Sequence, residues 1–200
     1  MKLYFSPGAC ALSPQIALRE AGLDFELVKV NLKEKKYADG GDYWAVNPKG
    51  SVPALEIDGG KVLTEGPAIV QYIADQAPQK KLAPANGTWE RAKLQEMLNF
   101  ITSELHKGYS PLFNPATPEE YKAMAKENLK KKYAYVDGIL AKQPYLLGEE
   151  FTVADGYLFN VSRWAGHVGF DLAPYANLGA FMERMNARPA VKEALAAEAA

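Results

Sequence analysis

The sequence contains little cysteine and histidine, which limits its redox and metal chemistry. Cys10 is the only thiol among 200 residues, so the chain cannot form an internal disulfide or a cluster of thiolate ligands. The two histidines, His106 and His167, lie far apart in the sequence, whereas a closed zinc site needs several clustered ligands. We therefore predict that the protein has no metal site.

Net charge and long apolar runs are lacking as well. The formal net charge is −1, so no overall field favours nucleic acid or a membrane surface. No apolar run approaches the roughly 20 residues of a membrane-spanning helix, and residues 1–5 lack the long apolar stretch of a secretory signal. A hydrophobic content of 48% is enough to form a core. We expect a cytoplasmic protein that contacts neither nucleic acid nor membrane.

The first 77 residues alternate between strand and helix patterns. Strand-like segments lie at 2–5, 25–30, 52–57 and 61–64, and the last two are joined by the hairpin sequence Asp58-Gly59-Gly60. Helices are expected at 14–21, ending before Gly22, and from Pro67 onward. The order strand, helix, strand and then strand, strand, helix predicts an α/β thioredoxin-like domain over 1–77.

The rest of the chain shows helical patterns only. Residues 78–88 contain two prolines, a glycine and no apolar period, which indicates a linker. Within 89–200, Thr117 and Thr152 each begin a capping-box sequence, and the first should open a helix that runs to about residue 142. We predict that 89–200 form an all-α helical bundle domain that contributes to a substrate pocket.

Cys10 follows the first expected strand and precedes a helix. The first turn of a helix carries unsatisfied N–H groups and partial positive charge, which stabilise a thiolate. This position predicts a reactive cysteine with a lowered pKa, and the alternative is a buried cysteine that serves only as a small apolar side chain.

The helix after the linker carries the second candidate for chemistry. Its apolar stripe is formed by Leu94, Leu98, Ile101 and Leu105. On the opposite side, Asn99, Ser103 and His106 share one face, and the sequence from Lys107 indicates that the helix ends just after the imidazole. A helix C-terminus favours the protonated imidazole. The stripe predicts a functional His106, unless it is simply a solvated polar face.

Five segments together resemble the cytosolic glutathione transferases, specifically the bacterial beta class with its N-terminal cysteine. They are PGAC at 7–10, NPKGSVPAL at 47–55, LTEGPAI at 63–69, ELHKG at 104–108 and FTVAD at 151–155. The resemblance covers essentially the whole chain, in order and at family spacing. It implies a thioredoxin-like domain followed by a helical domain, with Cys10 and His106 as catalytic residues.

The resemblance also implies a binding site for glutathione as co-substrate. The bond between Val52 and Pro53 would be cis, and the Val52 backbone would pair with the cysteinyl part of glutathione. Glu65 and the Gly66 N–H would hold the γ-glutamyl group. Lys35 would reach the glycyl carboxylate. The remaining glutathione contacts that the resemblance implies are Ala9, Asn99, Ser103, Glu104 and Lys107.

Simpler roles for these residues remain open from the sequence alone. Pro53 could be a turn proline, Glu65 an acid that favours a helix start, and Lys35 a solvated lysine. The chain also departs from many relatives, which carry a serine where it has Gly66 and a serine after the cysteine where it has Ala11. One hydroxyl donor to the sulfur is therefore absent.

The leading hypothesis is a detoxifying transferase that conjugates the glutathione thiolate to small apolar electrophiles. One alternative is a glutaredoxin-like thiol–disulfide oxidoreductase that uses Cys10, against which the missing second cysteine argues. Another is a non-catalytic glutathione-binding module. The sequence does not identify the electrophile, for which Tyr109, Phe113 and Trp164 are candidate contacts.

The resemblance further implies a homodimer, whose subunits pair through the thioredoxin-like domain of one and the helical domain of the other. If the polar side of the helix from Trp89 meets a partner, Asn99 and Glu104 could complete the neighbouring glutathione site. A monomer with a solvated stripe is the competing account.

Overall fold

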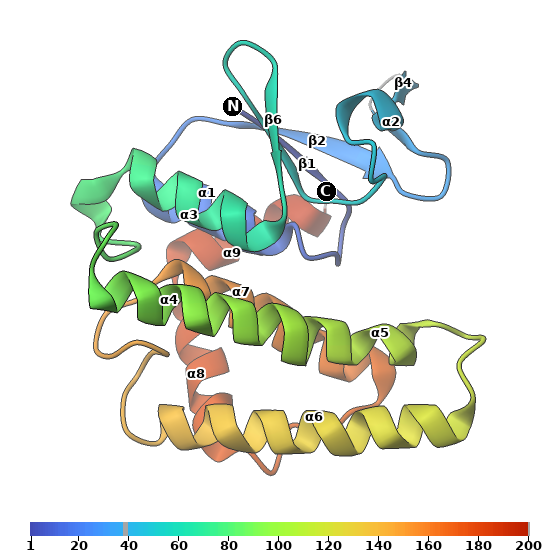
Figure 1. The fold of residues 1–200 in the computed structure, drawn as a ribbon, viewed down its shortest axis with the longest axis vertical. Coiled ribbons are helices and arrows are strands. Elements are labelled where there is room, and N and C mark those ends of the chain that lie inside the picture. The colour runs from blue at the N-terminus through green and yellow to red at the C-terminus, as the bar shows by residue number, and fades with distance from the viewer. Residues whose placement is uncertain (38–39, 200) are drawn as a thin grey trace. The chain divides into compact units, whose positions relative to one another are not determined.

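A computed structural model describes residues 1–37 and 40–199 of the protein (Figure 1). The described chain forms two compact units. The first unit comprises residues 1–83 together with the C-terminal segment that starts at Arg188, and the second unit comprises residues 84–187.

The first unit is built on one mixed sheet. Its strands are β1 (Lys2–Phe5), β2 (Glu26–Asn31), β3 (Lys36–Tyr37), β4 (Gly41–Asp42), β5 (Ala54–Ile57) and β6 (Lys61–Thr64), in the order β4-β3-β2-β1-β5-β6. Strand β1 pairs in parallel with β2 and antiparallel with β5, so Tyr4 lies between Val28 and Ala54. The predicted thioredoxin-like arrangement, with one parallel and one antiparallel half, is confirmed.

Helices of the first unit are α1 (Leu12–Ala21), α2 (Tyr43–Val46), α3 (Gly66–Gln76), the 3₁₀ helix η1 (Pro78–Lys80) and α9 (Pro189–Ala199). Helix α1 ends at Ala21, and its C-cap Gly22 adopts the left-handed conformation, as the sequence predicts. Helix α9 lies along α1, and Arg188 at its start forms a two-pronged ion pair with Glu20 at 2.6 and 2.9 Å. The sequence analysis had instead placed 189–199 at the end of the helical domain.

The core of the first unit includes residues from the segments that carry the motifs. Tyr4, Phe5, Val30, Tyr43 and Val52 belong to one buried apolar cluster. Because β1, β2, α2 and the 47–53 segment all contribute to this cluster, their backbones are fixed relative to one another. Sequence analysis missed β3, β4 and α2, since they are short and lie in a polar stretch without apolar periodicity.

The second unit is entirely helical in its described residues. Its elements are α4 (Trp89–Phe100), the π-helix η2 (Ile101–His106), α5 (Lys107–Phe113), α6 (Glu119–Leu140), α7 (Val153–Arg163), the 3₁₀ helix η3 (Trp164–Val168) and α8 (Ala176–Ala187). The predicted apolar stripe is confirmed, because Leu94, Leu98, Ile101 and Leu105 are all buried.

The two predicted capping boxes have different outcomes. The box at Thr152 is complete, with Asp155 as its acidic member. The box at Thr117 is wrong, because α6 begins at Glu119 after Pro118, and the Thr117 N–H donates to the Asn114 carbonyl in the preceding turn. Proline at the cap position offers no side-chain acceptor, so α6 starts without a side-chain cap.

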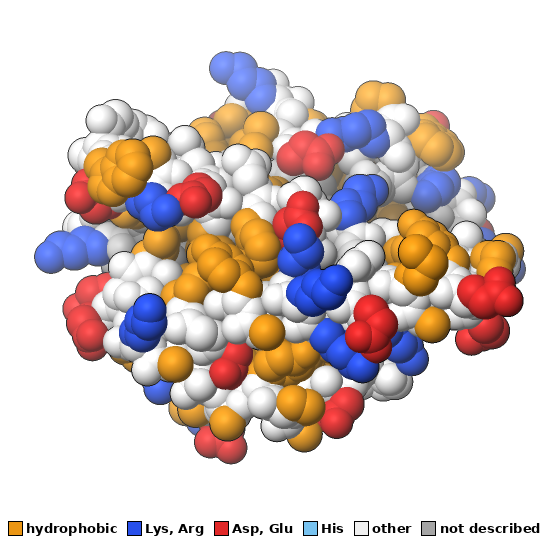
Figure 2. All heavy atoms as spheres, turned by 60° about the horizontal axis from the view of Figure 1, so that its bottom comes forward, with side chains coloured by type: hydrophobic (Ala, Val, Ile, Leu, Met, Phe, Trp, Pro, Cys, Tyr) orange, Lys and Arg blue, Asp and Glu red, His pale blue; other side chains and the backbone are white. Residues whose placement is uncertain are grey.

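The distribution of surface charge fits the small net charge of the chain. On the face drawn in Figure 2, basic and acidic side chains are interspersed, without an expanse of one sign. Within the described ranges 1–37 and 40–199, no helix is long and apolar enough to cross a membrane.

Candidate active site

The turn between β1 and α1 presents Cys10 to the 47–53 segment. The Ala9 N–H donates to the Ser6 carbonyl at 3.1 Å, and Gly8 adopts φ +74°, which closes the turn. The Cys10 thiol is partly buried and donates to the Val52 carbonyl at 3.2 Å. Two motifs that are 42 residues apart in the chain therefore meet at a hydrogen bond.

The expected lowering of the Cys10 pKa is wrong for this structure. Burial raises the pKa of the Cys10 thiol to about 11, against a smaller lowering by a backbone hydrogen bond and with a further rise from the Glu65 charge. Helix α1 begins at Leu12, nearer to Cys10 than predicted, but the thiol faces a carbonyl acceptor that favours its neutral form. Cys10 is therefore a neutral hydrogen-bond donor near pH 7.

Val52 lies at the end of a tightly braced turn. The Asn47 amide and the Tyr43 hydroxyl both donate to the Ser51 carbonyl, at 2.7 and 2.8 Å, and the Gly50 N–H donates to the Asn47 carbonyl at 2.8 Å. The bond from Val52 to Pro53 is cis, as the family resemblance implied. Among the described residues the Val52 N–H has no hydrogen-bond partner. It can therefore pair with a ligand.

Glu65 and Gly66 form the junction between β6 and α3. Glu65 has φ +70° and ψ 113°, a conformation that costs a non-glycine residue about 1–3 kcal/mol and that is concentrated at functional sites. Gly66 is the first helical residue, and its N–H has no partner within the described ranges. The Glu65 carboxylate is exposed and accepts from the Lys49 ammonium at 2.5 Å.

Lys35 lies against the same braced turn. Its ammonium donates to the Gly50 carbonyl at 2.6 Å and lies 5.5 Å from the centre of the Trp44 ring. Trp44 packs so closely on Gly50 that an added Cβ there would be 2.6 Å from the ring. Since Gly50 precedes Val52 by two residues, the structure brings Lys35 close to the segment that Cys10 contacts.

Tyr4 does not serve the sulfur in this arrangement. Its hydroxyl donates to a Glu56 carboxylate oxygen at 2.8 Å, and burial followed by this hydrogen bond raises the pKa of Tyr4 well above its ordinary value. A tyrosine committed to a carboxylate cannot stabilise a thiolate. This supports the expectation that Cys10, and not Tyr4, interacts with the glutathione sulfur.

His106 occupies the last position of the π-helix η2 in the second unit. Its Nδ1 is 2.7 Å from the Tyr157 hydroxyl, and its ring meets Trp164 edge-on with centroids 4.7 Å apart. Single π-helical turns occur frequently at functional sites. Sequence analysis missed the partner role of Tyr157, because a buried tyrosine in an apolar helical pattern reads as core.

Ser103 and Glu104, which precede His106 in η2, have hydrogen-bond and ion-pair partners within the second unit. The Ser103 hydroxyl donates to the Asn99 carbonyl at 3.1 Å, and the Glu104 carboxylate pairs with the Lys132 ammonium at 2.5 Å. This pairing lowers the pKa of Glu104. Asn99, Ser103 and Lys107 are exposed, so the predicted polar stripe is present at the surface.

The candidate contacts for an electrophile differ in accessibility. Phe113 is half exposed, and its ring packs edge-on against Trp164 with centroids 5.7 Å apart. Tyr109 is fully buried, and its hydroxyl is hydrogen-bonded to that of Tyr133 at 2.9 Å. Tyr109 is therefore a core residue.

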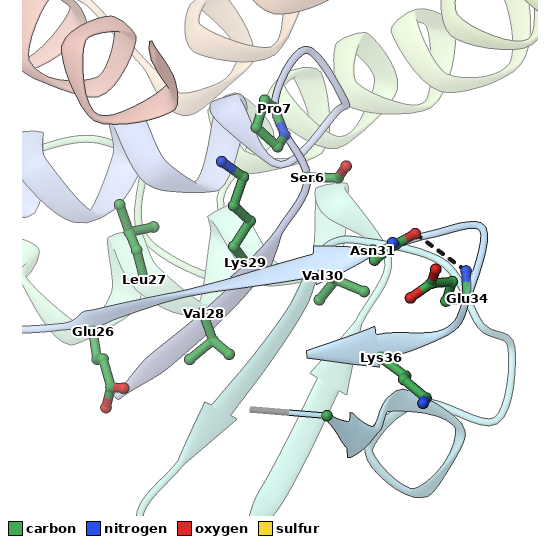
Figure 3. A pocket seen from close by; sticks show the side chains of 11 residues that line it. Ser6, Pro7, Glu26, Leu27, Val28, Lys29, Val30, Asn31, Glu34 and Lys36 are labelled. Atoms are coloured by element: carbon green, nitrogen blue, oxygen red, sulfur yellow. Dashed lines mark hydrogen bonds between the residues drawn. The ribbon is translucent and has the colours of Figure 1, made fainter. Parts of the chain in front are cut away.

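A hollow of about 710 Å³ lies beside β2 rather than at Cys10 (Figure 3). Its described lining comes from Ser6, Pro7, strand β2 and the segment that follows it. In Figure 3, Leu27 and Lys29 project to one side of β2, and Val28 and Val30 project to the other. None of the predicted site residues is part of this described lining. The described residues also contain no cluster of side chains suited to a metal ion.

Comparison with known protein families identifies the family of this chain. The model "Glutathione S-transferase, N-terminal domain" matches residues 1–75, and "Glutathione S-transferase, C-terminal domain" matches residues 100–189. The chain belongs to the glutathione S-transferase family. The glutathione S-transferase GstA of Escherichia coli O157:H7 is 52% identical over 199 residues, which cover 99% of this chain and 98% of GstA.

Solved structures refine the class of this glutathione S-transferase. A sphingomonad glutathione S-transferase complexed with glutathione superposes with a TM-score of 0.96 at 51% identity, covering 100% of this chain and 99% of that one. The beta class enzyme of Sphingomonas chungbukensis superposes with a TM-score of 0.95 at 49% identity, covering 99% and 98%. The predicted recognition, fold class and transferase function are confirmed, and the glutaredoxin-like alternative is not favoured.

Proposed function

We propose that the first unit of this glutathione transferase binds glutathione along the 47–53 segment and the β6–α3 junction. The observation that carries the proposal is the unpartnered N–H of Gly66 beside the strained Glu65. A helix N-terminus attracts the γ-glutamyl carboxylate, while the Glu65 carboxylate attracts the α-ammonium. The free N–H of Val52 pairs with the cysteinyl carbonyl, and Lys35 takes the glycyl carboxylate.

Cys10 acts in this proposal as a neutral donor to the glutathione sulfur. A thiol with a pKa of about 11 keeps its proton near pH 7, and glutathione is the species that ionises. When the cysteinyl part of glutathione engages Val52, the Cys10 S–H turns from the Val52 carbonyl to the glutathione thiolate. A hydrogen bond to the charged form lowers the pKa of the bound thiol and holds it for attack on an electrophilic carbon.

His106 accepts the glutathione thiol proton or donates a hydrogen bond to the sulfur. The Tyr157 hydroxyl lies 2.7 Å from Nδ1 and fixes the orientation of the imidazole ring. We expect His106→Ala to lower turnover roughly 10- to 1000-fold with little change in the KM for glutathione. Steady-state kinetics with a panel of halonitroarenes checks this, with His167→Ala at an exposed position as control.

Unchanged turnover of a folded His106→Ala variant would remove His106 from the reaction. The same panel tests the proposed substrate class, since the half-exposed Phe113 ring, which packs on the buried Trp164, is an apolar aromatic contact suited to small electrophiles. Detoxification of such compounds is the role that this chemistry supports. A cytoplasmic location stays a prediction, which cell fractionation tests.

A homodimer is the proposed assembly. A hollow of about 520 Å³ lies between α4 and α6, and its lining includes Met97, Tyr135 and Gly138. Tyr135 is half exposed and packs edge-on against Phe100 with centroids 5.1 Å apart. Exposed aromatic side chains beside an open hollow are typical of association surfaces. In such a dimer, Asn99 and Glu104 would complete the glutathione site of the neighbouring subunit.

A further inference from the structure

Lys49 is paired with Glu65, the carboxylate that the proposed function assigns to the α-ammonium of glutathione. Its ammonium donates to the Glu65 carboxylate at 2.5 Å and to the Thr64 hydroxyl at 2.7 Å. The sequence analysis gave no role to this lysine. In the structure, the Lys49 ammonium is paired with the Glu65 carboxylate.

The backbone beneath Lys49 is fixed, so its side chain starts from a defined place. The Lys49 N–H donates to the buried Asn47 side chain at 3.0 Å, and the Asn47 amide is itself bonded to the Ser51 carbonyl. The side chains of Lys49 and Glu65 are both substantially exposed, at 49% and 68%. An exposed pair of this kind is weak and can exchange partners quickly.

We propose that the Lys49 ammonium competes with the α-ammonium of glutathione for the Glu65 carboxylate, so that Lys49 sets the affinity for glutathione. This inference rests on the proposed role of Glu65. Two ammonium groups on one carboxylate lie within a few ångströms of each other and repel. Glutathione therefore has to displace Lys49 from Glu65. The free energy of the broken Lys49–Glu65 pair is subtracted from the free energy gained by the new pair between Glu65 and the α-ammonium.

Isothermal titration calorimetry at low ionic strength tests the competition through the Kd of glutathione. Lys49→Met keeps the length of the side chain and removes its charge, and should lower the Kd roughly two- to five-fold, the range expected for an exposed ion pair. Lys49→Arg keeps the competing charge and should leave the Kd near that of the wild type. Lys61→Met, at an exposed lysine of β6, is the control for net charge and should change nothing.

A glutathione analogue in which hydrogen replaces the α-amino group provides the decisive comparison. This analogue does not displace Lys49, so Lys49→Met should leave its Kd unchanged. A Kd for glutathione that is unchanged or higher in Lys49→Met overturns the proposal, as does an equal gain for the analogue. Glu65→Gln distinguishes failure of the Lys49 competition from failure of the proposed function. Unchanged glutathione binding in that variant refutes the proposed role of Glu65 itself.

Discussion

At the scale of single residues, three side chains of the proposed site donate to groups within the protein. The Cys10 thiol donates to the Val52 carbonyl, Lys35 to the Gly50 carbonyl, and Lys49 to Glu65. Partly buried polar groups without partners are costly, so their internal partners stabilise the side chains of Cys10 and Lys35. Binding is then an exchange of hydrogen bonds, and its net free energy is smaller than the contacts alone suggest.

The state of the Cys10 thiol has a direct chemical consequence. Because its pKa is raised to about 11, the thiolate fraction stays small at neutral pH and grows only as the pH rises toward that value. We expect the rate of Cys10 alkylation by iodoacetamide to increase steadily up to about pH 11, measured by mass spectrometry on the ligand-free enzyme. Free glutathione in the same buffers should level off near pH 8.5–9, about the ordinary range for a thiol.

A plateau for Cys10 at or below that of free glutathione would contradict the neutral-donor role. Such a result would restore the tuned thiolate that the strand-to-helix position predicts. The two outcomes differ because the field of a helix terminus and the desolvation of a thiol shift the pKa in opposite directions.

At the scale of secondary-structure elements, the start of α7 depends on one buried carboxylate. Asp155 accepts from the Leu146 N–H at 2.8 Å, from the Thr152 N–H at 2.7 Å and from the Thr152 hydroxyl at 3.0 Å. It thereby fixes the loop before α7, and α7 in turn carries Tyr157 to His106. Asp155 is a folding residue with an indirect effect on the site.

Asp155→Ala should lower the free energy of unfolding by about 3 kcal/mol, because it leaves two buried backbone N–H groups without acceptors. Urea denaturation followed by circular dichroism measures the loss. Asp171→Ala is a suitable control, since Asp171 accepts only from the Ala173 N–H in an exposed turn among the described contacts. A loss below about 1 kcal/mol in Asp155→Ala would show that the capping box contributes little.

The π-helix η2 illustrates what element-level prediction misses. Regular α-helical spacing placed Asn99, Ser103 and His106 on one face. The expectation that the helix ends just after His106 is wrong, because α5 (Lys107–Phe113) continues directly from η2. The widened turn from Ile101 to His106 has no simple sequence signature, because it depends on how α4, α6 and α7 pack around it.

At the scale of the whole molecule, the proposed homodimer rests on the surface of the second unit. The hollow between α4 and α6 is lined by Met97 and the half-exposed Tyr135 together with charged side chains such as Lys93. We expect light scattering at micromolar concentration to give about twice the chain mass of 21.9 kDa.

Tyr135→Lys should shift this mass toward that of a single chain, because it places a charge in an apolar contact. Tyr121→Lys, at an equally exposed tyrosine of α6, should leave the mass unchanged. A wild-type enzyme that is fully active at the mass of one chain would end the dimer proposal.

The sequence by itself determined the main strands and helices, and it indicated most of the residues of the candidate site. Strand alternation, helical stripes and capping residues are local patterns, so β6, the apolar stripe of α4 and the start of α7 could be read directly. The motifs around Cys10, Val52 and Glu65 were equally local, and their resemblance to one family identified the co-substrate.

Only the tertiary structure decided what these residues touch and in which state they are held. The neutral state of Cys10, the Lys49–Glu65 pair and the His106–Tyr157 contact each join segments that are distant in the chain. Such contacts depend on strand register, on the packing of buried side chains and on how deeply each group is desolvated. None of these quantities is encoded in a local pattern, and together they fix the chemistry available at the site.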